Sequence, residues 1–315
     1  MRTYGTYLVF FAAMLWATDA PFRIHLTQAL SSNFIVLGEH TVDMLFALPL
    51  LIWGFSEVRK LNWREWIAVL LVGVGGSALA GVAFTEAFHY VNPSVAILLQ
   101  KVQPLIAISL AGMMLKEKLT KRFWLWAAIA LGGAYLISFP SLIPQTYTGE
   151  VWNPNMIGVL LSLLAAALWG TSTVLGKYVL NQRSFQIMTS LRFAVGFVFL
   201  LGLNWFTGSF PAPGVLTDTD FLFIIIIAMV SGVFSLFIYY RGLSYTKASV
   251  ATLAELGYPF AAVVINWIFI PNSALMPMQL VGASVLLFAV LRLANYNDPD
   301  TSITDIPLDA AREPV

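Results

Sequence analysis

The sequence predicts an all-α, polytopic membrane protein with ten transmembrane helices, arranged as two inverted five-helix repeats. Three observations predict this fold class. Hydrophobic residues make up 59% of the 315 residues and charged residues only 10%, long apolar stretches recur along the chain, and motifs of the first half return in the second. A soluble domain carries roughly 25% charged residues, so this composition excludes an ordinary soluble enzyme.

Ten apolar stretches are long enough to cross a bilayer. About 20 apolar residues span the hydrocarbon core, so ten helices account for roughly 200 residues and leave no room for a separate soluble domain. The first stretch is not expected to be a cleaved signal peptide, because it is long, contains Asp19 and Arg23, and lacks a small-residue cleavage site. The predicted spans are residues 5–25, 33–54, 65–88, 93–115, 123–139, 156–177, 185–206, 221–243, 248–270 and 277–294.

Lys and Arg residues predict the orientation, since short loops rich in them stay in the cytoplasm. With the N-terminus inside, thirteen of them fall on the cytoplasmic side and only Arg23 lies near the opposite side. Both termini are therefore expected to be cytoplasmic, and the polar residues 295–315 are expected to form a disordered tail. The thirteen are Arg2, Arg59, Lys60, Arg64, Lys116, Lys118, Lys121, Arg122, Lys177, Arg183, Lys247, Arg292 and Arg312.

A motif of the first half recurs in the second half. The segment Tyr90–Leu98, followed by Pro104, returns as Tyr245–Leu253, followed by Pro259, at a constant offset of 155 residues. Chance similarity of two hydrophobic segments is the alternative, but it does not easily give so many identities in register. Because five spans per half is an odd number, the second half is predicted to lie upside down, as in secondary transporters. The predicted units are residues 1–145 and 146–294, followed by the tail.

Two further motifs complete a resemblance to a known family. Leu15–Thr18 matches Leu168–Thr171 at an offset of 153, which puts a Trp in the first helix of each half. The segment Leu115–Thr120 follows the fourth span and resembles the Gly-Glu-x-Leu-Thr sequence of that family. Together with the small-Ser-Val-Ala…Pro pattern of both fourth helices, these motifs make residues 5–294 similar to the drug/metabolite transporter superfamily of EamA type.

The resemblance implies a ten-helix carrier with a central cavity and cytoplasmic termini, and mostly the export of small metabolites. We expect it in a bacterial inner (plasma) membrane. Glu117 belongs to the family-like segment, but the equivalent position in the second half is Asn272. The acid therefore has no symmetrical counterpart, and the simpler interpretation is that it caps the end of its helix.

Charged residues inside the predicted spans are the main candidates for function. A charge at the bilayer centre costs about 2.5–3.5 kcal/mol, so each is expected to face a partner or water. By the repeat offsets Glu39 aligns with Arg192, and Gln100, beside Lys101, aligns with Glu255. The pattern predicts two ion pairs, Glu39 with Lys101 and Glu255 with Arg192. Each pair either ties helices together or exchanges its partner for a charged substrate group or a proton.

Other candidates lie on the same helix faces. Asp43 follows Glu39 by one turn and shares its face. Trp16, Asp19 and Arg23 form a stripe in which the two charges are expected to neutralise each other, and Arg23, near a span end, is expected to snorkel toward the interface. Trp169, Tyr90, Tyr239 and Tyr258 are candidates to line a cavity, with packing or interfacial anchoring as the alternative. Pro104 and Pro259 are predicted to kink their helices, whereas the spacing of Gly73, Ser77 and Gly81 indicates close helix contact rather than chemistry.

An enzyme has little support in the sequence. The three His residues are scattered without metal spacing, and no nucleophile or phosphate-loop motif occurs. There are no cysteines, so thiol chemistry is excluded, and the net charge of +1 without a basic stripe gives no reason to expect nucleic acid binding. We therefore expect no catalytic residue, no metal and no cofactor.

The sequence predicts a secondary-active carrier that works by alternating access on a small polar or amphipathic metabolite. The expected partners are this substrate, the lipid bilayer and protons as the candidate coupling ion, with Glu39 first and Glu255 second as the proton-coupling acid. The alternatives are an uncoupled carrier, a passive channel or receptor, and a membrane-embedded enzyme. The candidate substrate-binding residues are Trp16, Glu39, Asp43, Gln100, Lys101, Trp169, Arg192, Tyr239, Glu255 and Tyr258.

Overall fold

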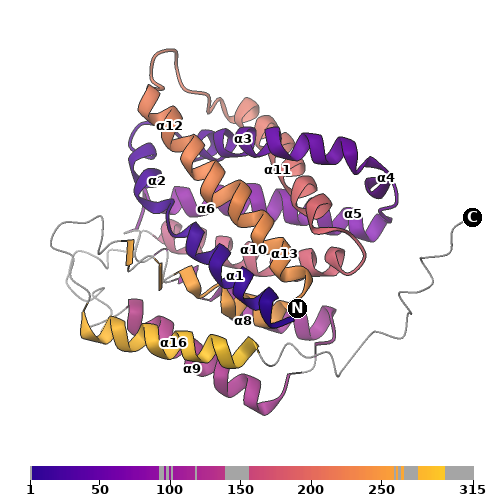
Figure 1. Cartoon of the computed structure of the whole chain (residues 1–315). Coiled ribbons are helices and arrows are strands. Elements are labelled where there is room, and N and C mark those ends of the chain that lie inside the picture. The colour runs from indigo at the N-terminus through magenta and orange to yellow at the C-terminus, as the bar shows by residue number, and fades with distance from the viewer. Residues whose placement is uncertain are drawn as a thin grey trace, which may run out of the picture.

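The computed structural model describes residues 2–91, 96, 99–100, 102–117, 119–138, 156–258, 260–261, 264–265 and 276–294. Within these residues the regular structure is entirely helical, as the sequence predicts (Figure 1). The predicted tail, residues 295–315, lies outside them. The elements are α1 Arg2–Trp16, α2 Ala20–Leu26, α3 Ser32–Trp53, α4 Phe55–Val58, α5 Trp63–Leu70, η1 Leu71–Leu79, α6 Ala80–Ala87, α8 Gln103–Met114, α9 Lys121–Ser138, α10 Met156–Leu180, α11 Phe185–Thr207, α12 Asp218–Ile227, η3 Ala228–Phe234, α13 Ser235–Ser244, α14 Ala248–Ala254 and α16 Pro277–Ala294.

Among the described residues, 5 helical stretches are long and apolar enough to cross a membrane. Two of them are composite, since α5, η1 and α6 run on as one rod and so do α12, η3 and α13. Shorter apolar helices cover Gln103–Met114 and Leu280–Leu293. These helices are those of a polytopic membrane protein, while the count of ten spans stays a prediction. The stretches are Ser32–Trp53, Trp63–Ala87, Met156–Leu180, Phe185–Thr207 and Asp218–Ser244.

Two prolines, Pro21 and Pro104, lie at helix starts rather than at kinks. The first predicted span is two helices, and Pro21 lies in the first turn of α2. Pro104 likewise lies in the first turn of α8, so the predicted mid-helix kink is wrong at this position. A proline fits the first turn because the N–H that it lacks has no partner there in any helix. Pro259 lies outside the described residues.

The two composite rods each contain a π-helical segment at an equivalent place, η1 in the first half and η3 in the second. Such segments are rare and are frequent at functional sites. Gly76 in η1 allows α10 to approach, because a Cβ there would lie 1.7 Å from Ser172 Oγ. Gly73 is close to Val195 in the same way. The close contact predicted from the glycine spacing is therefore present in this rod.

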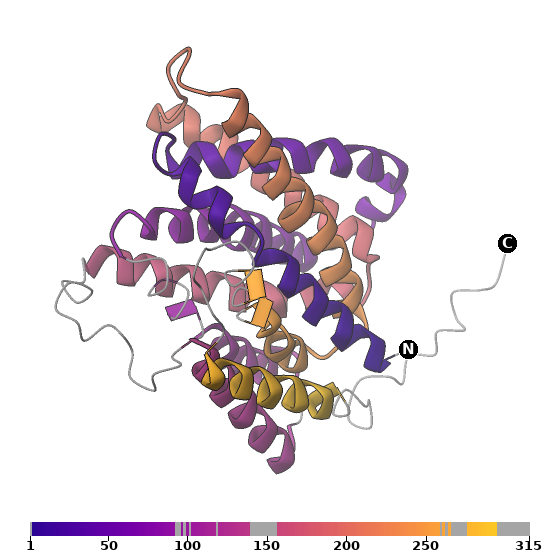
Figure 2. The same ribbon diagram turned by 60° about the vertical axis from the view of Figure 1, so that its left-hand side comes forward.

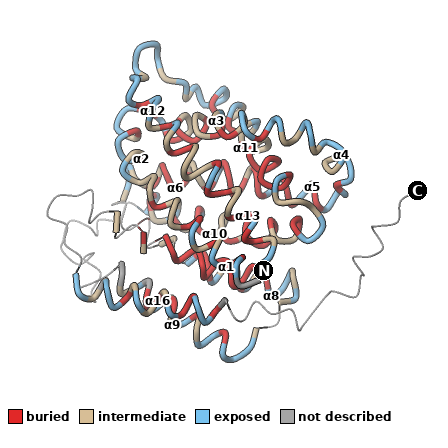
Figure 3. Tube along the Cα trace, viewed as in Figure 1, coloured by how far each residue is buried: buried red, intermediate tan, exposed pale blue. Residues whose placement is uncertain are grey.

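Helices of one half pack against helices of the other. First-half α1 packs against α13, α3 against α11, and α8 against α14, while α6 and η1 pack against α10. The last helices of the two halves, α9 and α16, lie side by side at one edge in both ribbon views (Figure 2). Buried residues concentrate where the halves meet, in the middle of the bundle (Figure 3). The centre of the molecule is therefore built jointly by both halves.

Acidic side chains of the first half also hold helix starts of the second. The carboxylate of Glu117 accepts hydrogen bonds from the backbone N–H groups of Ala248 (2.7 Å) and Ser249 (3.1 Å). It thus caps the N-terminus of α14, where the exposed N–H groups favour a negative charge, rather than its own helix end. Glu65 contacts Arg183 at 2.7 Å, just before α11, and this hydrogen bond raises the pKa of the guanidinium.

Two adjacent glycines of α9 allow a matched test of this packing. A Cβ on Gly133 would lie 2.8 Å from the backbone N of Leu286 in α16, whereas a Cβ on Gly132 would meet nothing within 4 Å. We expect Gly133→Ala to destabilise the protein by about 1–3 kcal/mol, because backbone atoms must move apart. Gly132→Ala has the same helix propensity change and is the control. Thermal unfolding of both purified variants measures the difference, and equal melting temperatures would contradict the predicted contact.

Candidate functional site

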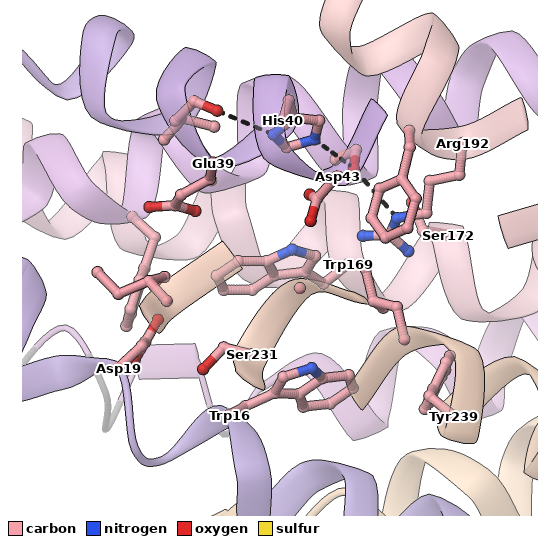
Figure 4. A pocket seen from close by; sticks show the side chains of 18 of the residues that line it. Trp16, Asp19, Glu39, His40, Asp43, Trp169, Ser172, Arg192, Ser231 and Tyr239 are labelled. Atoms are coloured by element: carbon pink, nitrogen blue, oxygen red, sulfur yellow. Dashed lines mark hydrogen bonds between the residues drawn. The ribbon is translucent and has the colours of Figure 1, made fainter. Parts of the chain in front are cut away.

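A cavity of about 170 Å³ lies where the two halves meet (Figure 4). By the volume that one water needs, it holds on the order of ten water molecules. Nine of the ten candidate substrate-binding residues line it, and the tenth, Lys101, lies outside the described residues. That they bind substrate stays a prediction. The nine are Trp16, Glu39, Asp43, Gln100, Trp169, Arg192, Tyr239, Glu255 and Tyr258.

One buried guanidinium joins two acids at one end of this cavity. Arg23 is 7% exposed, and its Nη1 and Nη2 lie 2.9 and 3.1 Å from the two carboxylate oxygens of Glu39. Its Nε and Nη2 also donate to Asp19, and its Nη1 donates to Thr85 Oγ1. The guanidinium thus donates four hydrogen bonds, and its Nη1 also forms an ion pair with Oε1 of Glu39. They hold α2, α3 and α6 together at the point where α1 ends.

This cluster confirms one sequence prediction and corrects another. Asp19 and Arg23 do neutralise each other one turn apart. Arg23 does not snorkel, however, because it turns inward to bind Glu39. The predicted partner of Glu39 was Lys101, which the structure does not describe. Sequence spacing missed the contact between Arg23 and Glu39 because the two residues lie on different helices and break the repeat symmetry.

A second acid, Glu255, lines the cavity where a helix breaks. Glu255 follows the last residue of α14 and accepts hydrogen bonds from Tyr239 Oη (2.8 Å) and Gln103 Nε2 (2.5 Å), with Thr173 Oγ1 at 3.3 Å. Gln103 is the first residue of α8. The hydrogen bond between them therefore joins the broken fourth helices of the two halves. The lining includes Gln103 and Thr173, which the sequence did not single out.

The predicted ion pair between Glu255 and Arg192 is not formed. The Arg192 guanidinium donates instead to Ser77 Oγ (3.2 Å), to Tyr240 Oη (3.0 Å) and to the carbonyl of Gly76 (3.0 Å). Gly76 and Ser77 both belong to the π-helical segment η1. The prediction paired Arg192 with Glu255 from the repeat symmetry alone. It failed because it did not take into account the polar atoms of η1, which bind Arg192 instead.

A chain of hydrogen bonds continues from Arg192 to a buried histidine. His40 Nδ1 lies 2.9 Å from the Val36 carbonyl, which can only accept, so Nδ1 carries a proton. His40 Nε2 lies 2.8 Å from Ser77 Oγ, which already accepts from Arg192 and is free to donate its own proton to Nε2. Neutral His40 satisfies every group in this chain. Ser77 therefore has a polar role in addition to the close helix contact predicted for it.

Aromatic rings cover the other walls of the cavity. Trp16 packs against Tyr239 with ring centroids 5.2 Å apart, and Trp169 packs against Phe84 at the same separation. The two Trp residues come from the equivalent first helices of the halves, and both indoles border the space into which α3 points its carboxyl groups (Figure 4). Tyr90, the remaining aromatic candidate, is not among the lining residues.

Asp43 has a different environment from the other acids. It is 2% exposed, and its Oδ1 has no hydrogen-bond partner among the described residues. Its carboxyl group lies against the bare backbone of Gly232 in η3, where a Cβ would come within 2.5 Å of Oδ1. No group of three His, Cys, Asp or Glu residues in the described part of the chain is arranged to hold a metal ion.

Sequence comparison decides the class of the protein. The EamA-like transporter family matches residues 3–139 and again residues 156–294. The chain belongs to this family. The resemblance to the drug/metabolite transporter superfamily is thereby confirmed, since EamA is part of it. The protein is an integral membrane transporter rather than an enzyme.

Individual relatives agree with this membership. The riboflavin transporter ImpX of Fusobacterium nucleatum is 32% identical over 302 residues, which cover 93% of this chain and 98% of the relative. The uncharacterized transporter YwfM of Bacillus subtilis is 23% identical over 248 residues, 78% of each chain. A solved crystal structure has the same fold, with a TM-score of 0.74 at 14% identity over 94% of this chain and 98% of the other.

The Arg23 cluster gives a prediction about stability. Arg23→Gln leaves two buried carboxylates without their cation, and breaking a buried pair in this way costs about 3–5 kcal/mol. We expect the double variant Arg23→Gln/Glu39→Gln to recover part of that loss, because one uncompensated charge is removed. Arg59→Gln, at an exposed position, is the control. Thermal unfolding in detergent compares them, and a single Arg23→Gln variant as stable as the control would refute the assignment.

Proposed function

We propose that this transporter carries riboflavin, or a closely related planar heteroaromatic metabolite, through the central cavity. The observation that carries the proposal is the pair of indoles, Trp16 and Trp169, that both halves place on one cavity. Flat aromatic rings bind by stacking on such side chains. The relative named a riboflavin transporter supports this substrate, because its identity of 32% extends over nearly the full length of both chains.

The polar groups of the cavity suit the edge of such a ring. Riboflavin presents carbonyl oxygens and an N–H group along one edge of its ring system and hydroxyls along its side chain. Ligand sites combine apolar walls with a few placed polar groups of this kind. In this cavity Arg192 and Gln103 carry donor groups, and Glu39 and Glu255 carry acceptor oxygens. Each of them now has protein partners, so the substrate would bind these groups by exchanging those partners.

We further propose that the carrier works by alternating access between two inverted halves. Three observations support this: the family matches the two halves separately, equivalent helices of the halves pack in exchanged pairs, and the broken helices α8 and α14 meet at the cavity. Discontinuous helices beside a central site are typical of secondary transporters with inverted repeats. Rocking of one half against the other would open the cavity to each side in turn.

Transport of riboflavin is the first test. Riboflavin is fluorescent, so its movement into or out of proteoliposomes that contain the purified protein can be followed directly. We expect saturable flux and counterflow, which a passive channel or receptor does not show. The resemblance to exporters predicts net outward movement, and vesicles of known protein orientation measure this direction. Absence of riboflavin flux and of riboflavin binding would refute the substrate assignment while leaving the family membership intact.

Substitution of the two indoles tests the site. Trp16→Ala and Trp169→Ala each remove a stacking surface worth about 0.5–1.5 kcal/mol beyond the area it buries, so we expect riboflavin affinity to fall roughly tenfold. Trp16→Phe keeps a ring and should recover most of the loss. Trp205→Ala is the control, because this side chain is 77% exposed and outside the cavity. Quenching of riboflavin fluorescence on titration measures binding, and equal affinity in all variants would place the substrate elsewhere.

The proposed orientation is testable separately. We propose that both termini are cytoplasmic, on the basis of the thirteen Lys and Arg residues that the inside-positive rule places there. A reporter that is active only in the cytoplasm, fused after Val315, should therefore be active, and a reporter that needs the periplasm should be silent. The same two fusions after Gly208, in the loop that follows α11, should give the opposite result. Matching signals at both positions would contradict the inverted arrangement.

The driving force of transport is the remaining question. Transport is either coupled to protons or proceeds by facilitated diffusion without an ion. Glu39 and Glu255 stay the acids predicted for coupling from the sequence. Each now has identified partners, however, because Arg23 binds Glu39 and three hydroxyl or amide groups surround Glu255. A flux that does not change when a pH gradient is imposed would establish facilitated diffusion.

A further inference from the structure

We propose that Asp43 is the proton-binding site of this carrier. The inference deepens the proposed transport function, and it rests on a contrast between Asp43 and the other three acids that line the same cavity, Asp19, Glu39 and Glu255. All four lie inside the bundle, where a charge without a partner is costly. They differ in what their carboxyl oxygens touch, and only Asp43 lacks a partner that would hold it in the charged form.

The other three acids have partners that stabilise a carboxylate, and Asp19 shares the Arg23 guanidinium with Glu39. Both oxygens of Glu39 face the Arg23 guanidinium at 2.9 and 3.1 Å. In Glu255, Oε1 accepts from Tyr239 and Oε2 accepts from Gln103. Charge-assisted hydrogen bonds and a bidentate guanidinium are the contacts that stabilise a buried carboxylate. Each of these acids therefore has at least one cation or hydrogen-bond donor that stabilises its charged form.

Asp43 is more buried than the other three acids and has fewer partners. It is 2% exposed and forms no ion pair within the described residues, and its Oδ1 has no hydrogen-bond partner there. The carboxyl group also faces the cavity, so water and protons can reach it when the cavity opens. A proton on Oδ1 converts the carboxylate into a neutral carboxylic acid and removes the buried charge. The reverse step returns this proton to cavity water and leaves the carboxylate.

Every element packed around Asp43 agrees with this assignment. On its own helix, Glu39 lies one turn away and is negative, and His40 is neutral in its chain to Ser77. From α11 comes Arg192, whose Nε, Nη1 and Nη2 each donate to an acceptor other than Asp43. The lining residues from η3, α6 and α12 are not titratable: they are Ser231, Gly232, Gly81, Phe84 and Ile227.

The position of Asp43 also explains how proton binding would be linked to movement. Its carboxyl group touches Gly232 in η3, a π-helical segment of the second half, whereas Asp43 itself belongs to the first half. Arg192, the nearest cation of the second half, is held by η1. Because η1 belongs to the first half, as Asp43 does, a shift between the halves changes the distance from Asp43 to this cation when it breaks the contacts of Arg192 with η1. The proton would be released when Arg192 approaches and bound when it withdraws.

Infrared spectroscopy of the purified protein tests the site without any substrate. A protonated carboxyl group has a C=O stretching band distinct from that of a carboxylate. We expect this band in the parent, with an intensity that falls as the pH rises, and we expect it to be missing from Asp43→Asn. It should persist in Glu39→Gln, in Glu255→Gln and in the control Glu86→Gln, whose carboxyl group does not line the cavity. A parent without the band at any pH, or an Asp43→Asn variant that retains it, would overturn the proposal.

A second variant, Asp43→Glu, and a transport assay also test the proposal. If Asp43→Asn does not fold, Asp43→Glu preserves a carboxyl group, and the band should shift in frequency; an unchanged band would show that it arises elsewhere. In proteoliposomes, the ratio of riboflavin flux with a pH gradient to flux without one should fall to unity in Asp43→Asn and stay at the parent value in Glu86→Gln. An unchanged ratio in Asp43→Asn would refute the coupling role. If the parent moves no riboflavin, the proposed function fails, while the infrared result still decides the proton site.

Discussion

The cost of a charge inside a membrane is the constraint on which this structure depends. Arg23 meets it by distributing one guanidinium over Asp19, Glu39 and Thr85, and those contacts fix the relative positions of three helices. The buried charge of Arg192 is stabilised by hydrogen bonds that it donates to a hydroxyl, a phenol and a backbone carbonyl. Because each cation draws its partners from several elements, the charged residues organise the centre of the bundle as well as furnishing its cavity.

The apolar part of this fold was predictable from the sequence. Apolar length placed Ser32–Trp53 and Phe185–Thr207 to within a few residues, because a membrane helix needs continuous apolar sequence and little else. The positions at which the helices are interrupted were less predictable. Pro104 was expected to bend a helix and instead begins one, since the choice depends on what hydrogen-bonds the neighbouring backbone. The π-helical segments η1 and η3 have no sequence signature of their own beyond small residues.

The residues of the candidate site were predictable from the sequence, whereas their contacts were not. Charge and aromaticity inside apolar spans were enough to select nine residues that the fold brings to one cavity, because such residues have few other places to go in a membrane. Their pairing was not predictable. The contact of Glu39 with Arg23 and the attachment of Arg192 to Ser77 depend on helix rotation and on the backbone of η1, neither of which spacing within one helix reports. The hydroxyls of Ser172 and Thr173, one turn from Trp169, were a visible signal that the aromatic pattern obscured.

The paired π-helical segments have a consequence for how such a cavity changes over evolutionary time. A bond from residue i to i+5 encloses one more residue than an α-helical turn, so each segment carries surplus length within its rod. Removing a single residue from Leu71–Leu79 would let that turn close as an ordinary α-helix while both ends of the rod keep their places. The Gly76 carbonyl that receives Arg192 would then be drawn back into the helix. Deletion of one amino acid from η1 would thus alter the polar lining of this cavity without exchanging any of the side chains that line it.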